Sequence, residues 1–161
     1  MSTLYVDTIT EKTVGNGVQI ADLVPAAGSV IQVVQGQNTV RQTISSSSFV
    51  TSNLDVNITP TSSSSKILVI AQTSGNSESA NRSLKYTLYR DSTNLGGTSG
   101  LGLIESPQAR LQTPLVASIL DSPSTTSQIT YALYVSASSS IVEVPATPNA
   151  VSSIIVMEIA Q

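Results

Sequence analysis

Apolar and polar residues alternate along much of the chain with the period of two that is typical of β-strands. The clearest example lies in residues 54–72, where Leu54, Val56 and Ile58 alternate with polar neighbours. A proline and a run of serines then break the pattern, and residues 67–70 are apolar at every position. A strand that is apolar on both faces lies in the middle of a sandwich or against a neighbouring subunit. The stretch predicts two strands joined by a polar turn.

Similar segments recur along the rest of the chain, separated by residues that favour turns. The candidate strands are Ser29–Val34, Val40–Ile44, Phe49–Ile58, Lys66–Thr73, Ser83–Arg90, Leu115–Leu120, Ile129–Ser136, Ile141–Val144 and Ser153–Ala160. One long irregular loop is expected from Gly96 to Pro114. No window combines helical spacing with caps. Eight or nine antiparallel strands with short turns favour an all-β fold, a jelly-roll-like β-sandwich.

The beginning of the chain differs from this body. Residues 3–10 resemble a strand, Asn16-Gly17 favours a type I′ turn, and residues 18–20 form a short return strand. A two-stranded ribbon of this size is not stable alone in water. We therefore expect residues 1–27 to form an N-terminal β-arm that pairs with another chain, ahead of a sandwich domain at 28–161.

The composition is low in both aromatic and charged residues. Aromatic residues make up 4% of the 161 residues, so the core must consist of Val, Ile and Leu. Charged residues make up 11%, against about 25% in ordinary soluble domains. Few charges leave the edges of a sheet poorly protected, and a symmetric oligomer hides such edges. The composition therefore favours a homo-oligomer.

The distribution of charge argues against two classes of partner. The seven basic residues are scattered and the net charge is −3, whereas nucleic-acid binding requires a concentrated basic face. No run approaches 18 apolar residues, and the first residues do not resemble a signal peptide. We expect no nucleic-acid or membrane partner, and synthesis in a cytoplasm.

Candidate catalytic chemistry is sparse. The chain has no His and no Cys, which excludes His-based triads, Cys–His dyads and His-based metal sites. Asp121, Glu143 and Glu158 fall at strand ends or exposed strand positions, and we expect them to be solvated, with Glu158 facing solvent or a basic partner. The turn after Arg90 lacks the clustered carboxylates of a calcium loop. We expect no catalytic residue, no cofactor and no metal.

Two tyrosines are candidates for a subunit contact. Tyr89 and Tyr134 alternate with apolar residues that fill the other face of their strands. Both should therefore point outward, where Tyr often anchors an interface. We assign them to the subunit interface of the expected homo-oligomer, with an ordinary exposed Tyr as the alternative.

Several segments resemble proteins of tailed phages. The opening TLYVDTITEKTVGNGVQI resembles the N-terminal segment of tail-fibre and virion surface proteins, especially of phages of cyanobacterial and marine hosts. The body resembles the terminal β-domain of the same proteins, in the segments GSVIQVV, SFVTSNLDVNITPTSSSSKILVIAQTSG, LYRDSTNLGG, LDSPSTTSQITYALYVSA and IIVMEIA. These segments cover most of the chain and follow in the same order.

The resemblance implies a homotrimeric β-sandwich, similar in shape to tumour-necrosis-factor and complement head domains, on an arm that tethers it to the particle. The attachment residues expected in the arm are Leu4, Tyr5, Val6, Ile9, Val18 and Ile20. Phage fibres have a long shaft between arm and head, whereas here residues 25–28 are almost all there is. That departure favours a capsid decoration (cement) protein on the virion surface, bound to the major capsid protein or to a tail protein.

Two other functions compete with this one. The first is a short tail fibre or receptor-binding protein whose loops, such as the one from Gly96 to Pro114, contact the host surface. That loop has no aromatic residue, which disfavours direct capture of a glycan. The second is an enzyme such as a depolymerase, which would depend on carboxylates such as Asp121 and Glu143.

Overall fold

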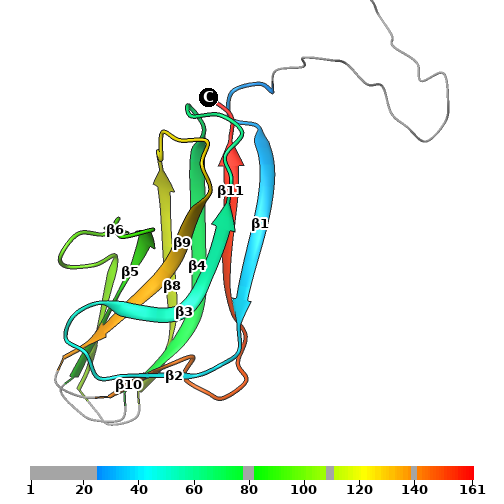
Figure 1. The fold of residues 1–161 in the computed structure, drawn as a ribbon. Helices are drawn as coiled ribbons and strands as arrows, with labels where there is room; N and C mark the ends of the chain where they lie inside the picture. Colours follow the sequence, from blue (N-terminus) through cyan, green and yellow to red (C-terminus); the bar gives the residue numbers. More distant parts are fainter. Residues whose placement is uncertain (1–24, 78–81, 108–110, 139–140) are drawn as a thin grey trace, which may run out of the picture.

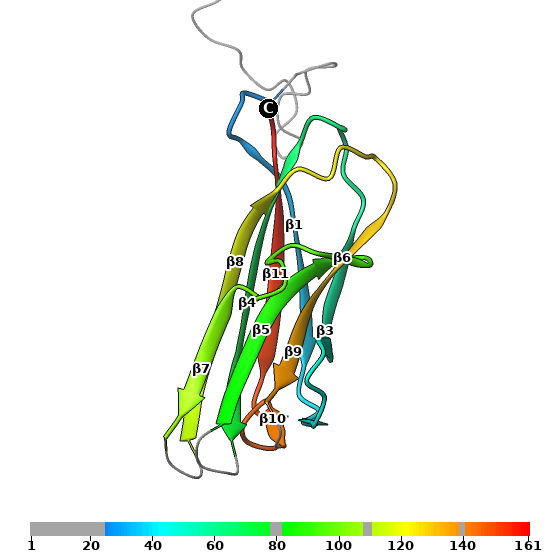
Figure 2. The same cartoon turned by 90° about the vertical axis from the view of Figure 1, so that its left-hand side faces the viewer.

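The computed structural model describes residues 25–77, 82–107, 111–138 and 141–161, and these residues form two antiparallel β-sheets packed face to face (Figures 1 and 2). The predicted all-β sandwich is confirmed. The strands are β1 (Val30–Asn38), β2 (Gln42–Ile44), β3 (Val50–Ile58), β4 (Lys66–Ser77), β5 (Arg82–Arg90), β6 (Thr93–Asn94), β7 (Gly102–Ser106), β8 (Leu111–Asp121), β9 (Ile129–Ala137), β10 (Val142–Val144) and β11 (Ser152–Ile159).

The larger sheet, called sheet A here, is organised around β4. Strands β11 and β10 pair with the same edge of β4, β11 along residues 66–72 and β10 at residues 76–77. Strand β8 pairs with the opposite edge along residues 67–77. Strand β1 pairs with the outer edge of β11, and β2 pairs with that of β10. Strand β4 is therefore the central strand, with β1 and β8 at the two edges.

The smaller sheet, called sheet B here, has the order β3-β9-β5, and β6 and β7 both pair with the free edge of β5. Strand β3 contains an irregularity between Thr51 and Leu54, where its register with β9 shifts. Asn53 within it has a positive φ of 58°. The bulge leaves Ser52 turned inward, where its hydroxyl donates to the carbonyl of Leu133 at 2.8 Å.

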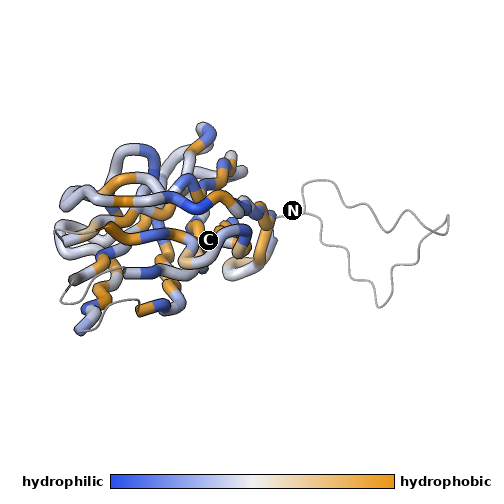
Figure 3. The backbone as a smooth tube through the Cα atoms, turned by 90° about the horizontal axis from the view of Figure 1, so that it is seen from below, coloured by the Kyte–Doolittle hydropathy of each residue, from blue (hydrophilic) through white to orange (hydrophobic). Residues whose placement is uncertain are grey.

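The core lies between the sheets and consists almost entirely of aliphatic side chains, as the composition predicts. Leu54, Val56 and Ile58 are buried and their polar neighbours on β3 are exposed, which confirms the predicted alternation. Apolar and polar positions are interspersed along the backbone of the sandwich (Figure 3), but β4 and β11 contain uninterrupted apolar runs at residues 67–70 and 154–157. One aromatic ring, that of Tyr131, is fully buried among the described residues.

Both ends of the described sandwich meet at one pole. The amide of Gly28 donates to the carbonyl of Ala160, and the amide of Ala160 donates to the carbonyl of Ser29, each at 2.9 Å. The loop between β3 and β4, residues 59–65, lies at the same end (Figure 1). We call this end the amino-terminal pole, because the chain passes into β1 there.

The predicted loop from Gly96 to Pro114 is wrong. Residues 102–106 form β7 on the edge of β5, and β8 begins at Leu111. Glycine and proline in this segment hide the period of two. Pro114 lies inside β8. Proline has no backbone N–H to donate, and this is tolerated here because β8 is an edge strand that pairs with a neighbour on only one side.

Strand β1 of sheet A approaches β3 of sheet B closely at Gly36. A Cβ atom at Gly36 would overlap with the backbone carbonyl oxygen of Asp55. Glycine is the residue that permits such a close approach of two backbones. Gly36 therefore fixes how the edge of sheet A closes onto sheet B.

We predict that Gly36→Ala lowers the free energy of unfolding by about 2 kcal/mol or more, because the added methyl group forces β1 and β3 apart. The control is Thr43→Ala at an exposed position of β2 in the same sheet, which should change it by no more than about 0.5 kcal/mol. Urea unfolding followed by circular dichroism measures both. Equal stability of Gly36→Ala and the wild type would show that the close approach is not a constraint.

Candidate functional site

Glu158 is buried on the inner face of β11, with a relative exposure of 0%. Its carboxylate accepts hydrogen bonds from the side-chain amide of Gln32 at 2.6 Å and from the amide and hydroxyl of Thr61, each at 2.8 Å. The amide of Ser62 donates to the same carboxylate at 3.3 Å. The expectation that Glu158 faces solvent or a basic residue is wrong. Its partners are donors of the β3–β4 loop and β1, so it fastens that loop to the end of the sandwich.

The pKa of Glu158 reflects two opposing effects. Burial alone raises the pKa of the carboxyl group, but hydrogen bonds led by those from Gln32 and including those from Thr61 outweigh it. The net result is a pKa below the ordinary 4.5 of a glutamate. The folded protein therefore favours the ionised form of this group.

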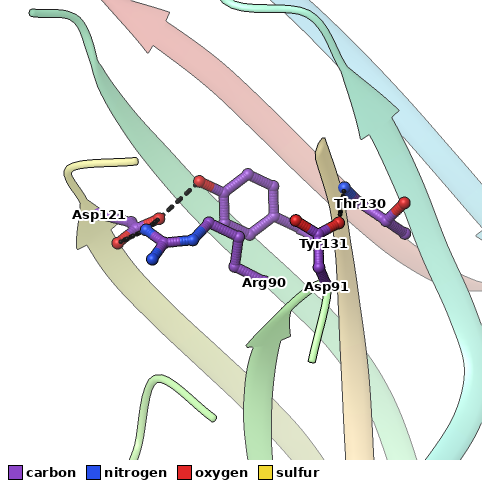
Figure 4. A network of polar contacts seen from close by, with 5 residues as sticks. All are labelled: Arg90, Asp91, Asp121, Thr130 and Tyr131. Carbon is purple, nitrogen blue, oxygen red and sulfur yellow. Dashed lines mark hydrogen bonds and ion pairs between the residues drawn. The ribbon is translucent and has the colours of Figure 1, made fainter. Parts of the chain in front are cut away.

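Asp121 forms a second, partly buried polar link, between the two sheets (Figure 4). Its carboxylate, at the end of β8, accepts hydrogen bonds from Nη1 of Arg90 at 2.7 and 2.9 Å and from the hydroxyl of Tyr131 at 2.7 Å. Arg90 and Tyr131 both belong to sheet B. Burial, together with the bond to Asp121, raises the pKa of Tyr131, which keeps its hydroxyl a donor. Next to this link, the carboxylate of Asp91 accepts a hydrogen bond from the backbone amide of Thr130 at 2.9 Å, which attaches the β5–β6 turn to β9.

Glu143 lies on the outer face of sheet A, far along β4 from the other two carboxylates. It pairs with Arg41 at 2.9 Å and accepts from the side-chain amide of Asn76 at 3.1 Å. Glu158 and Asp121 both lie beside Ile67, and Glu143 lies beside Asn76, nine residues further along the strand. Glu143 therefore does not face either of them across a cleft. All three carboxylates act as structural anchors in this arrangement.

The structure brings Tyr89 and Tyr134 together on the outer face of sheet B. Their rings stack with centroids 4.0 Å apart and an angle of 25° between the ring planes. Both rings are half-buried, while Leu88 and Leu133 on the same strands point into the core. The two residues face outward as predicted. Their assignment to a subunit interface stays a prediction.

The outer face of sheet A carries the most unusual surface in the described residues. The register aligns Val33, Met157, Leu68 and Leu120 in one row across β1, β11, β4 and β8. Two parallel rows follow, in the order Gln35, Ile155, Ile70 and Ser118, then Gln37, Ser153, Gln72 and Val116. Within these rows the edge-strand residues Val33, Val116 and Leu120 are 57%, 58% and 51% exposed. Seven of the twelve residues in these rows are apolar and the other five are Gln or Ser, and we call the three rows the apolar face.

The outer face of sheet B differs sharply in chemistry. Its exposed positions on β3 are Thr51, Asp55 and Asn57, and β5 and β7 add Lys85 and Glu105. No charged residue occurs in the three rows of the apolar face, and Lys66 lies just beyond them beside Ile159. An antiparallel sheet that faces water alternates apolar and polar residues. Sheet B follows this rule and sheet A does not.

The apolar face can bind another apolar surface but offers no group for chemistry. The row with Val33, Met157, Leu68 and Leu120 resembles the interior of a sandwich rather than its exterior. Contiguous exposed apolar surface on this scale marks an interaction site. The sequence signal for it was present in residues 67–70, apolar at every position, whereas the contributions of β1 and β8 become visible only through the register.

Other candidate features are outside the described residues or absent from them. The arm residues Leu4, Tyr5, Val6, Ile9, Val18 and Ile20 lie outside the described part of the chain. Within that part, no group of three or more His, Cys, Asp or Glu side chains could hold a metal ion. The described residues also contain no helix that is long and apolar enough to span a membrane.

No protein-family model matches this chain, and no curated protein matches it. The function must therefore be argued from the surfaces and contacts of the molecule, together with the resemblance of its sequence segments.

We predict that Glu158→Gln lowers the free energy of unfolding by roughly 2 kcal/mol. The NH₂ group of the new side chain is a donor, so it cannot accept the hydrogen bonds that one carboxylate oxygen accepts in the wild type. The exposed Glu105→Gln on β7 is the matched control and should have an effect within about 0.5 kcal/mol. Because the folded pKa lies below 4.5, the stability from Glu158 is present above that pH and is lost as the pH falls through the folded pKa. Unfolding measured from pH 7 to pH 3 should therefore show a smaller decrease for Glu158→Gln than for the wild type. Parallel curves would contradict this account.

Proposed function

We propose that this chain is a structural protein of a tailed-phage virion, a homotrimeric capsid decoration or cement protein that attaches through its N-terminal arm. The observation that supports a structural role best is the apolar face of sheet A, which needs a partner surface. The resemblance of the arm and the body segments to virion surface proteins supports the phage context. The three carboxylates considered as catalytic candidates are engaged with donors of the protein, which agrees with a role without chemistry.

We also infer that the sandwich is a jelly roll. The order of the long strands supports this: β1-β11-β4-β8 in sheet A and β3-β9-β5-β7 in sheet B. Consecutive strands β3, β4 and β5 alternate between the two sheets, as do β7, β8 and β9. Eight strands in two sheets with such crossings agree with jelly-roll architecture.

The position of the first described residues at one end of the sandwich supports attachment by the arm. The described chain begins at the amino-terminal pole, where Gly28 and Ser29 bond to Ala160. An arm that precedes residue 28 leaves the sandwich from that pole. In the proposed virion this pole faces the particle and the opposite pole faces away from it.

We predict that Leu4→Asp together with Val6→Asp, in the full-length chain, reduces binding to particles that lack the protein by at least tenfold, since buried carboxylates oppose pairing of the arm. Thr13→Asp together with Gln19→Asp adds the same charge at polar positions outside the face of Leu4 and Val6 and should bind nearly normally. Co-sedimentation with particles measures binding, and thermal unfolding checks that the sandwich is unchanged. Full binding of the Leu4 and Val6 variant would rule out the arm as the attachment element.

One observation favours the alternative of a host-recognition protein. Tyr89 and Tyr134 stack on a face that also presents Asp55 and Asn57, and aromatic rings beside polar groups are common at ligand sites. Under the preferred function, purified full-length protein does not adsorb to host cells, and Tyr134→Ala leaves particle binding unchanged. Adsorption is measured as depletion of the protein from the supernatant. If the wild type adsorbs to host cells and Tyr134→Ala does not, the host-recognition function is supported and the cement function is contradicted.

A further inference from the structure

We propose that the apolar face of sheet A is the surface through which copies of this chain associate, so that sheet A rather than sheet B faces the trimer axis. This inference rests on the proposed homotrimer and specifies its interface. It places the interface on the sheet opposite to Tyr89 and Tyr134.

The chemistry of the apolar face matches the centre of a subunit interface. Interfaces are depleted of charge in their cores and polar at their rims. The three rows of the apolar face contain no charge. Lys66 lies at one end of them, and the neutralised Arg41–Glu143 pair lies beyond the other end. The face therefore has an uncharged centre, with its apolar side chains concentrated in the first two rows and its charged groups at the margins.

The size of the face is sufficient for part of such an interface. Four strands at about 4.8 Å spacing, over five residues of about 3.3 Å each, give a flat patch of roughly 320 Å². A standard interface buries about 800 Å² per partner. The patch, which includes Val116 and Leu120 on the edge strand β8, therefore accounts for about two-fifths of that area.

A second copy of the chain is the occupant that fits these properties. A surface without charge has no electrostatic preference for an acidic or basic partner, and its natural complement is another apolar surface. A ring of identical chains supplies such a surface from within the assembly. It also covers the free edge of β8, which otherwise presents unpaired backbone groups.

The test compares two leucines of equal exposure on opposite sheets. Leu120 on sheet A is 51% exposed and Leu103 on sheet B is 50% exposed. We expect full-length Leu120→Lys to sediment as a single 16.7 kDa chain at concentrations at which the wild type and Leu103→Lys sediment at about three times that mass. Circular dichroism confirms that each variant is folded.

The outcomes separate the inference from the proposed function. Trimeric Leu120→Lys together with dissociated Leu103→Lys or Tyr134→Ala would place the interface on sheet B and overturn the inference, while the trimer stands. A wild type that sediments as a single chain at every concentration would overturn both. If such a single chain still bound to particles, the proposal that the protein attaches to the virion would stand without the trimer.

A second measurement applies even if a lysine variant fails to fold. The chain has no cysteine, so a single introduced thiol reports on its own position. We expect maleimide to label Val116→Cys at least tenfold more slowly than Leu103→Cys in the assembled protein, and at a similar rate after dissociation in mild denaturant. Equally fast labelling of both thiols in the assembled protein would overturn the inference.

Discussion

The structure depends on a central strand that is apolar on both faces. Ile67 and Val69 of β4 point into the core, while Leu68 and Ile70 between them point outward. Pairing with β11 on one side and β8 on the other continues both patterns across sheet A. A sheet built in this way forms one core with sheet B and presents a second apolar layer on its exterior. Burial of that second layer is the physical reason to expect an assembly.

Two carboxylates, one buried and one partly buried, hold the amino-terminal pole together. Glu158 and Asp121 occupy the same inner row of sheet A, on either side of Ile67. Glu158 fastens the β3–β4 loop, and Asp121 connects sheet A to Arg90 and Tyr131 of sheet B. Hydrogen bonds to a charged acceptor are stronger than neutral ones, so these few contacts order the loops at that pole. The chain achieves this without disulfides, since it has no cysteine.

The sequence predicted strands wherever a period of two was uninterrupted. Leu54, Val56 and Ile58 showed which face of β3 is buried because nothing between them breaks the alternation. Strand β7 was missed because its pattern spans only five residues and includes a glycine, and its existence depends on the free edge of β5. Pro114 suggested a loop, and only its position on an edge strand reconciles it with β8.

The candidate site was harder to predict because it depends on pairing between distant segments. Val33, Met157, Leu68 and Leu120 form one row only in the register of four strands from across the chain. Glu158 follows the period of β11 onto its inner face, but the donors that make its burial possible come from the β3–β4 loop and β1. Tyr89 and Tyr134 were assigned to the exterior from alternation alone, whereas their mutual stacking required the pairing of β5 with β9. The most direct measurement of the central claim is methyl NMR of the wild-type full-length protein with a soluble paramagnetic probe. The account predicts that the methyl signals of Val33, Val116 and Leu120, which are as exposed as Leu103 in the single chain, remain sharp while those of Leu103 broaden; equal broadening of both groups would contradict it.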